Sequence, residues 1–125
     1  MNRNVEQSFG EFIASKREEK KITLREMARL LKITPPYLSD IEKDRRNSPD
    51  KDKLDEIAAI LSLSEEECSY MYDLAGKKRN SISPDLPEYI MERDYVRVAL
   101  RKAIDLDVGE DEWKKFIEEL EDRKG

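Results

Sequence analysis

The sequence predicts an all-α protein, and three observations support this prediction. Apolar residues recur along most of the chain at the i, i+3, i+4, i+7 spacing of an amphipathic helix. Several of these stripes begin at a residue that can cap the amino terminus of a helix. No segment shows the polar-apolar alternation of a half-buried strand, and a charged fraction of 42% with only four glycines is typical of a soluble helical protein.

The first helix is expected over residues 8–20, and two short helices with capped amino termini follow it. Thr23 can accept a hydrogen bond from the amide of Glu26, and the Glu26 carboxylate can reach back, which together make a capping box. The second short helix starts at Thr34, with Pro35 in the first helical position, where a missing N–H costs nothing. A turn of about three residues separates the two, which is the spacing of a helix-turn-helix. The inward residues of these three helices are Phe9, Phe12 and Ile13, then Leu24, Met27, Ala28 and Leu31, then Leu38 and Ile41.

The helix that starts at Thr34 has an outer surface suited to reading DNA. A basic loop, residues 43–47 (KDRRN), follows it directly and offers donors for phosphate groups. An ordinary helical hairpin inside a bundle has the same periodicity, so the pattern alone leaves both interpretations open. The residues left on the outer surface are Pro36, Tyr37, Ser39, Asp40 and Lys43.

Two further helices complete the amino-terminal part of the chain. Asp50 can cap one of them, and Ser64 with Glu67 forms a capping box for the other, which is expected to run to about Ala75 and to end at Gly76. Residues 76–84 (GKKRNSISP) predict a linker, so we expect an amino-terminal domain over residues 1–80. The apolar stripes are Leu54, Ile57, Ala58 and Leu61 in the first helix, and Cys68, Met71, Tyr72 and Ala75 in the second.

Residues 81–125 predict a small helical carboxyl-terminal region. Three apolar patterns suggest three helices, and the acidic residues 110–112 suit the amino terminus of the last one. Helices this short bury little by themselves, so we expect them to pack on the first domain or on a second copy. The predicted dimer or partner surface consists of Val96, Leu100, Trp113, Phe116, Ile117 and Leu120.

Residues 22–49, ITLREMARLLKITPPYLSDIEKDRRNSP, resemble the lambda-repressor-like helix-turn-helix of bacterial and phage regulators, also called the xenobiotic-response-element family. The resemblance extends over roughly residues 8–76. It is carried by Arg17, Thr23, Ala28, the PPYLSDIE run and the loop residues Arg45, Arg46 and Asn47. The resemblance implies a five-helix DNA-binding domain, so it favours DNA binding over the ordinary hairpin.

The resemblance also implies which residues meet DNA. It implies a structural ion pair between Arg17 and Glu42. Lys21 and Asp44 stand where the family commonly has glycine, so at both positions either the residue takes a positive φ or the turn differs slightly from that of the family. The implied base contacts are Thr34, Pro36, Tyr37 and Asp40, and the implied phosphate contacts are Thr23, Lys43, Arg45, Arg46 and Asn47.

The net charge of −5 at first argues against a nucleic-acid partner, because neutralising phosphates needs lysine and arginine. The charge is unevenly distributed, however. Residues 1–80 hold 16 basic and 16 acidic side chains, whereas residues 81–125 hold 8 and 13. The acidity therefore belongs mainly to the carboxyl-terminal region.

Little in the chain points to enzymatic chemistry, a cofactor or a metal. There is no histidine and no glycine-rich phosphate loop, and the single Cys68 cannot form an internal disulfide and is expected to be a small core residue. No apolar run approaches eighteen residues, and the first ten residues lack the apolar segment of a secretion signal. We therefore expect a cytoplasmic protein that is not an enzyme, with no membrane partner.

The leading hypothesis is a sequence-specific transcriptional regulator, a dimeric repressor that binds a palindromic operator in double-stranded DNA. A pair of reading helices would occupy half-sites with centres about 34 Å apart. The alternative is an antitoxin-like autoregulator whose carboxyl-terminal helices bind a partner protein. A further alternative, by resemblance to repressors of mobile elements, is release of repression when a peptidase cleaves the tail.

Overall fold

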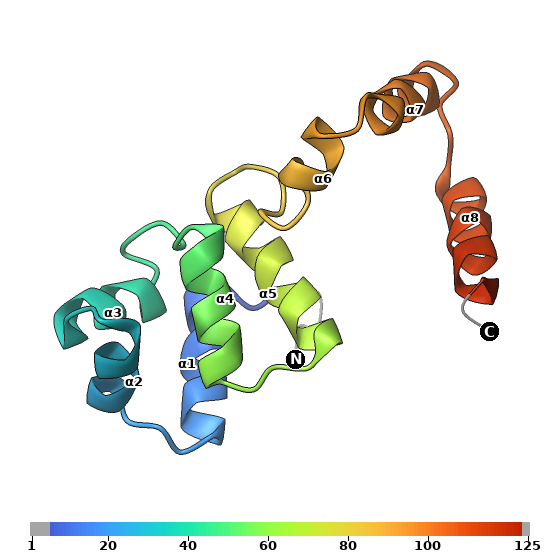
Figure 1. Ribbon diagram of the computed structural model, residues 1–125. Helices are drawn as coiled ribbons and strands as arrows, with labels where there is room; N and C mark the ends of the chain where they lie inside the picture. Colours follow the sequence, from blue (N-terminus) through green and yellow to red (C-terminus); the bar gives the residue numbers. More distant parts are fainter. Residues whose placement is uncertain (1–5, 124–125) are drawn as a thin grey trace. The chain divides into compact units, whose positions relative to one another are not determined.

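The structure is a computed structural model that describes residues 6–123. In this range the chain forms eight helices and no strand, as the sequence predicted. The chain divides into two compact units, Met1–Pro87 and Glu88–Gly125 (Figure 1).

The first unit contains five helices around one hydrophobic core. They are α1 (Phe9–Glu19), α2 (Leu24–Leu31), α3 (Pro35–Glu42), α4 (Lys51–Ile60) and α5 (Glu65–Lys78). The pair α2–α3 lies on one side of α1 and α4, and α5 lies on the other (Figure 1). The buried core residues are Phe9, Phe12, Ile13, Met27, Ala28, Leu31, Leu38, Ile41, Leu54, Ile57, Leu61, Met71, Leu74 and Ala75. Leu24, Ala58 and Tyr72 pack against this core but stay partly exposed, and Cys68 is half-buried.

The helices begin where the sequence predicted, because the caps are local. The side chains of Ser8, Thr23, Thr34, Asp50 and Ser64 each accept a hydrogen bond from the amide three residues later. The capping box at Ser64 is complete, since Glu67 accepts from the Ser64 amide at 2.9 Å. The one predicted at Thr23 is only half formed. The Glu26 carboxylate instead accepts from Arg29 at 2.6 and 3.0 Å, a bidentate ion pair that competes with a single neutral amide.

Helix α5 does not end at Gly76, and this corrects the sequence prediction. The helix ends at Lys78 with Arg79 as its carboxyl-terminal cap, and Asn80 follows in the left-handed conformation with a φ of 55°. Gly76 lets residues 82 and 83 approach α5 closely, because a Cβ at this position would lie 2.9 Å from the Ser83 nitrogen and 3.0 Å from the Ile82 carbonyl carbon. The expected linker over residues 76–84 therefore begins as helix and then folds back against that helix.

Helices α1 and α5 are joined at the surface by an ion pair. Lys16 Nζ donates to Glu67 Oε2 at 2.5 Å. This bond, with the Ser64 amide as a second donor, lowers the pKa of Glu67 from its ordinary 4.5 to about 2. A lowered folded-state pKa stabilises the fold at pH values above about 4.5, and this contribution is lost as the pH falls towards 2.

The second unit contains α7 (Asp94–Asp105) and α8 (Glu110–Asp122), and α6 (Pro87–Met91) lies at its start. Arg97 donates to the carbonyls of Ile90 and Met91, which terminates α6. None of the three helices has a buried residue. No helix in residues 6–123 is long and apolar enough to span a membrane.

A close contact between α1 and α3 fixes the geometry of the first unit. A Cβ on Gly10 would lie 2.4 Å from the Glu42 carbonyl oxygen and 2.6 Å from that of Ile41. Both oxygens belong to the backbone at the end of α3, so no side chain can rotate away to make room. Residue 10 therefore has to be glycine if the two helices are to touch.

We predict that Gly10→Ala lowers the free energy of unfolding by about 3 kcal/mol or more, because the methyl group forces α1 away from α3. Urea unfolding followed by circular dichroism measures the change. Gly109→Ala is the control, since a Cβ there meets nothing within 4 Å. It should change the stability by at most about 1 kcal/mol. Equal effects of the two substitutions would contradict this account of the contact.

Candidate nucleic-acid interface

The turn between α2 and α3 sets where the exposed face of α3 begins. Lys32 ends α2 in the left-handed conformation, with φ 60°, and partly buried Ile33 packs against the core. Thr34 then caps α3 by accepting from the Tyr37 amide at 3.3 Å. Leu38 and Ile41 are buried. The opposite face of α3 is thereby turned outward.

The carboxyl-terminal end of α3 is fixed to α1 by a buried ion pair. Arg17 Nε donates to Glu42 Oε2 at 2.7 Å, and Arg17 Nη2 donates to Oε1 at 3.1 Å. The side chains are only 12% and 8% exposed. Arg17 also donates to the Ile22 carbonyl at 2.9 Å, so it ties the segment before α2 to the same point. The Glu42 carboxylate raises the pKa of Arg17, which stays charged.

Asp44 makes a second connection between α3 and α1. Its φ of 60° places it in the left-handed conformation directly after α3, and Lys21 after α1 has a φ of 61°. Of the two alternatives that the sequence left open, a positive φ or a different turn, the structure has the positive φ at both residues. Its carboxylate accepts from the Ser8 hydroxyl at 2.5 Å and from the Gly10 amide at 2.9 Å, at the amino terminus of α1. The sequence pointed only to the backbone conformation of Asp44. The capping box of Ser8 with Glu11 was readable in the sequence, but nothing pointed to Asp44.

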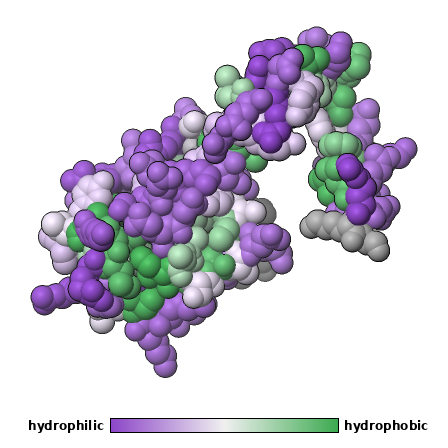
Figure 2. Space-filling view, in the orientation of Figure 1, coloured by the Kyte–Doolittle hydropathy of each residue, from purple (hydrophilic) through white to green (hydrophobic). Residues whose placement is uncertain are grey.

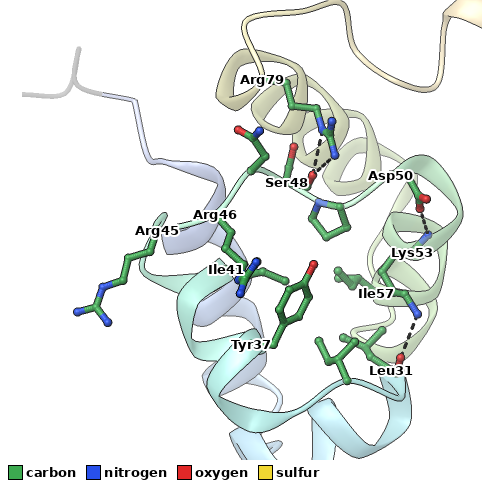
Figure 3. A pocket seen from close by; sticks show the side chains of 13 residues that line it. Leu31, Tyr37, Ile41, Arg45, Arg46, Ser48, Asp50, Lys53, Ile57 and Arg79 are labelled. Atoms are coloured by element: carbon green, nitrogen blue, oxygen red, sulfur yellow. Dashed lines mark hydrogen bonds between the residues drawn. The ribbon is translucent and has the colours of Figure 1, made fainter.

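The basic loop after α3 is held by α5. Lys78 Nζ donates to the Asp44 carbonyl at 2.8 Å, and Arg79 Nε donates to the Ser48 carbonyl at 2.9 Å (Figure 3). Ser48 is 1% exposed, and its hydroxyl donates to the Ala75 carbonyl at 2.9 Å. These three residues were missed, because no periodicity or motif marks contacts 27 to 34 residues apart.

The proposed DNA-contacting residues lie together on this part of the surface. Thr23 and Pro35 line one shallow hollow, which brings the start of α2 beside the start of α3. The Thr23 hydroxyl accepts from the Glu26 amide at 3.0 Å and keeps its own hydrogen for a further acceptor. Asp40 is partly exposed. The exposed members are Thr23, Thr34, Pro36, Tyr37, Lys43, Arg45, Arg46 and Asn47.

Tyr37 and Asp40 both contact the cations of the loop. The Arg46 guanidinium lies 4.3 Å from the centroid of the Tyr37 ring. Asp40 carboxylate oxygens lie 3.6 Å from Arg45 Nη1 and 3.7 Å from Arg46 Nε. The Tyr37 ring points into a pocket between α3 and α4 that Ile41 and Ile57 also line (Figure 3). Its ring is therefore turned partly towards the core, while 39% of the residue stays exposed.

Comparison with known families identifies this arrangement. Residues 13–68, which run from α1 into α5, match the family model described as Helix-turn-helix. These residues are a helix-turn-helix domain of the lambda-repressor-like family. The comparisons with curated proteins and with solved structures gave no match. The helix-turn-helix domain is a DNA-binding domain.

We predict that Arg17→Met destabilises the helix-turn-helix domain by about 3–5 kcal/mol, because it leaves the buried Glu42 carboxylate without a counter-charge. Urea unfolding measures the loss. The double variant Arg17→Met with Glu42→Leu should recover most of the stability, since both charges are then gone. A single variant as stable as the wild type would show that the pair does not hold α3 on α1.

Proposed function

We propose that this protein is a dimeric, sequence-specific transcriptional repressor that binds a palindromic operator through α3. The observation that supports this most is the exposed face of α3, flanked by cations and fixed at its end to α1. Rigid placement matters, because base readout depends on the position of each donor and acceptor. Such a regulator would act in the cytoplasm, on double-stranded DNA and without a cofactor.

The chemistry of the α3 face limits what it can read. Pro36 has no donor, so it contributes shape and contact with thymine methyl groups. Tyr37 offers a hydroxyl that donates or accepts. Asp40 can accept from the amino group of cytosine. No arginine of α3 is available for guanine, so we expect sites whose half-sites depend on thymine and cytosine at the contacted positions.

Asp40 has to leave its cation neighbours before it can accept from a base. Its separations of 3.6 and 3.7 Å from Arg45 and Arg46 exceed hydrogen-bond length, and the arginines are largely exposed. Exposed ion pairs of this kind contribute little. We expect phosphate groups to replace Asp40 as the partner of Arg45 and Arg46 when DNA binds. The Asp40 carboxylate is then free to accept from a base edge. Thr23, Lys43 and Asn47 complete the phosphate set.

The second unit has the properties of an association surface. Trp113, Phe116, Ile117 and Leu120 form one stripe along α8 and are 38–51% exposed. Figure 2 shows hydrophobic surface on this helix. Trp113 also lines a hollow with Leu100 of α7, and Val96 lies one turn before Leu100. Since none of its three helices has a buried residue, this unit gains stability by covering such faces.

Charge favours a second copy as the molecule that covers them. Helix α7 carries three basic and two acidic side chains, whereas α8 carries two basic and seven acidic ones. The α8 of one copy can therefore pack its stripe against the α7 of another with opposite net charge. A two-fold pair of this kind places two α3 helices on one duplex, with half-site centres about 34 Å apart.

The function is tested by selecting bound duplexes from a random pool and then measuring affinity for the selected site. We predict that Arg45→Ala with Arg46→Ala weakens binding to all duplexes and reduces the slope of log K against log salt by about two, one for each lost phosphate contact. Asp40→Asn should instead change which bases are selected. Failure to select any site, or selected-site affinity unaffected by either variant, would refute the proposal.

We also predict that Trp113→Ala with Phe116→Ala converts the dimer to a monomer in sedimentation equilibrium and weakens binding to the full palindrome more than to a half-site. Lys115→Ala with Glu119→Ala is the control, because both residues lie on α8 outside the stripe and the net charge is unchanged. A monomeric wild type would contradict the dimer. A stoichiometric protein partner bound through the same stripe would favour the antitoxin-like alternative.

A further inference from the structure

The last turn of α5 holds the loop that carries the proposed phosphate contacts. This loop clamp consists of three residues: Ser48, Lys78 and Arg79. Lys78 Nζ donates to the Asp44 carbonyl at 2.8 Å, at the start of the loop. Arg79 donates twice to the Ser48 carbonyl, at 2.9 and 2.5 Å, at its end. The Ser48 hydroxyl closes the arrangement by donating to α5 at Ala75.

The clamp leaves the middle of the loop free for DNA. Ser48 is buried, whereas Arg45, Arg46 and Asn47 between the two fixed carbonyls are exposed. Among residues 6–123, Arg45 and Arg46 form ion pairs with Asp40 alone, and neither contact is of hydrogen-bond length. The backbone of the loop is therefore ordered, while its side chains remain available.

We propose that Ser48, Lys78 and Arg79 are positioning residues for DNA binding, which rests on the function proposed above. They hold the loop in the conformation that meets the phosphates before DNA arrives. The conformational entropy of ordering the loop is then lost on folding and not on binding, which increases affinity. Lys78 and Arg79 lie beyond residue 68, where the family match ends, so residues outside the matched segment would set its DNA contacts.

A direct contact of Lys78 and Arg79 with phosphates is the competing explanation, and the chain offers variants that separate the two. Ser48→Ala removes a tether of the loop without changing any charge. Arg79→Ala removes a tether and a charge. Lys77→Ala removes an equal charge from the same turn of α5, but Lys77 pairs with Glu6 at 2.8 Å, and within residues 6–123 it makes no hydrogen bond or ion pair with the loop.

The experiment measures affinity of the full chain for its selected duplex over a range of salt, together with amide hydrogen exchange of residues 45–48 in the free protein. We expect Ser48→Ala and Arg79→Ala each to weaken binding about tenfold, the size expected when one residue regains its backbone freedom. Ser48→Ala should keep the wild-type salt slope. Both variants should speed exchange in the loop, and Lys77→Ala should change neither affinity nor exchange by more than about twofold.

Melting curves show whether each variant is folded at the assay temperature, and Arg79→Ala is the safer test because Arg79 is exposed. Unchanged loop exchange in both clamp variants would overturn the proposal, whether or not DNA is bound. Faster exchange with unchanged affinity would also overturn it, and so would an equal loss of affinity in Lys77→Ala. Absence of DNA binding by the wild type would instead count against the proposed function.

Discussion

The carboxyl-terminal end of α3 is fixed to α1 at three points, and the arrangement of the DNA-facing residues depends on them. Gly10 lets the α3 backbone approach α1 directly. Arg17 and Glu42 pair in a nearly buried site. The pair stabilises one placement of α3 on α1, because any other placement leaves a buried charge uncompensated. The backbone of Asp44 turns the chain at the end of α3, and its carboxylate binds Ser8 at the amino terminus of α1. The axis of α3 and the start of the basic loop are therefore set together.

The face that this arrangement presents combines attraction with discrimination. Cations of the loop provide affinity for any duplex, since phosphates are alike in every sequence. The negative charge of Asp40 opposes that attraction unless a base donates a hydrogen bond to the carboxylate, so a carboxylate on α3 disfavours duplexes without a suitable donor. The same carboxylate lies near Arg45 and Arg46 in the free protein, which reduces the positive charge available for non-specific binding.

Local features were predictable from the sequence, and long-range ones were not. Caps at Thr23, Thr34, Asp50 and Ser64 and the buried stripes follow from residues within one or two turns, and the structure has them. Gly76 was misjudged, because a glycine after an apolar stripe is typical of a helix end, whereas here it admits residues 82 and 83. The predicted capping box of Thr23 with Glu26 is only half formed, because Arg29 competes for the Glu26 carboxylate.

The same limit applies to the candidate site. The resemblance implied the Arg17–Glu42 pair and the exposed residues of α3 and the loop, but it did not indicate which residues hold that loop in place. The sequence indicated no role for Ser48 in holding the loop, and residues 77–79 fell within the predicted linker. Their partners lie far away in the chain, so only the folded backbone brings them together.

The central claim is that the exposed face of α3 and the loop behind it meet DNA. Titrating the isotope-labelled protein with its selected duplex, and following every backbone amide by nuclear magnetic resonance, tests this most directly. The account predicts that the largest shifts fall at Thr23 and in residues 34–47, with the amides of α8 nearly unchanged. Shifts concentrated in α7 and α8, or on the faces of α4 and α5 away from the loop, would contradict it.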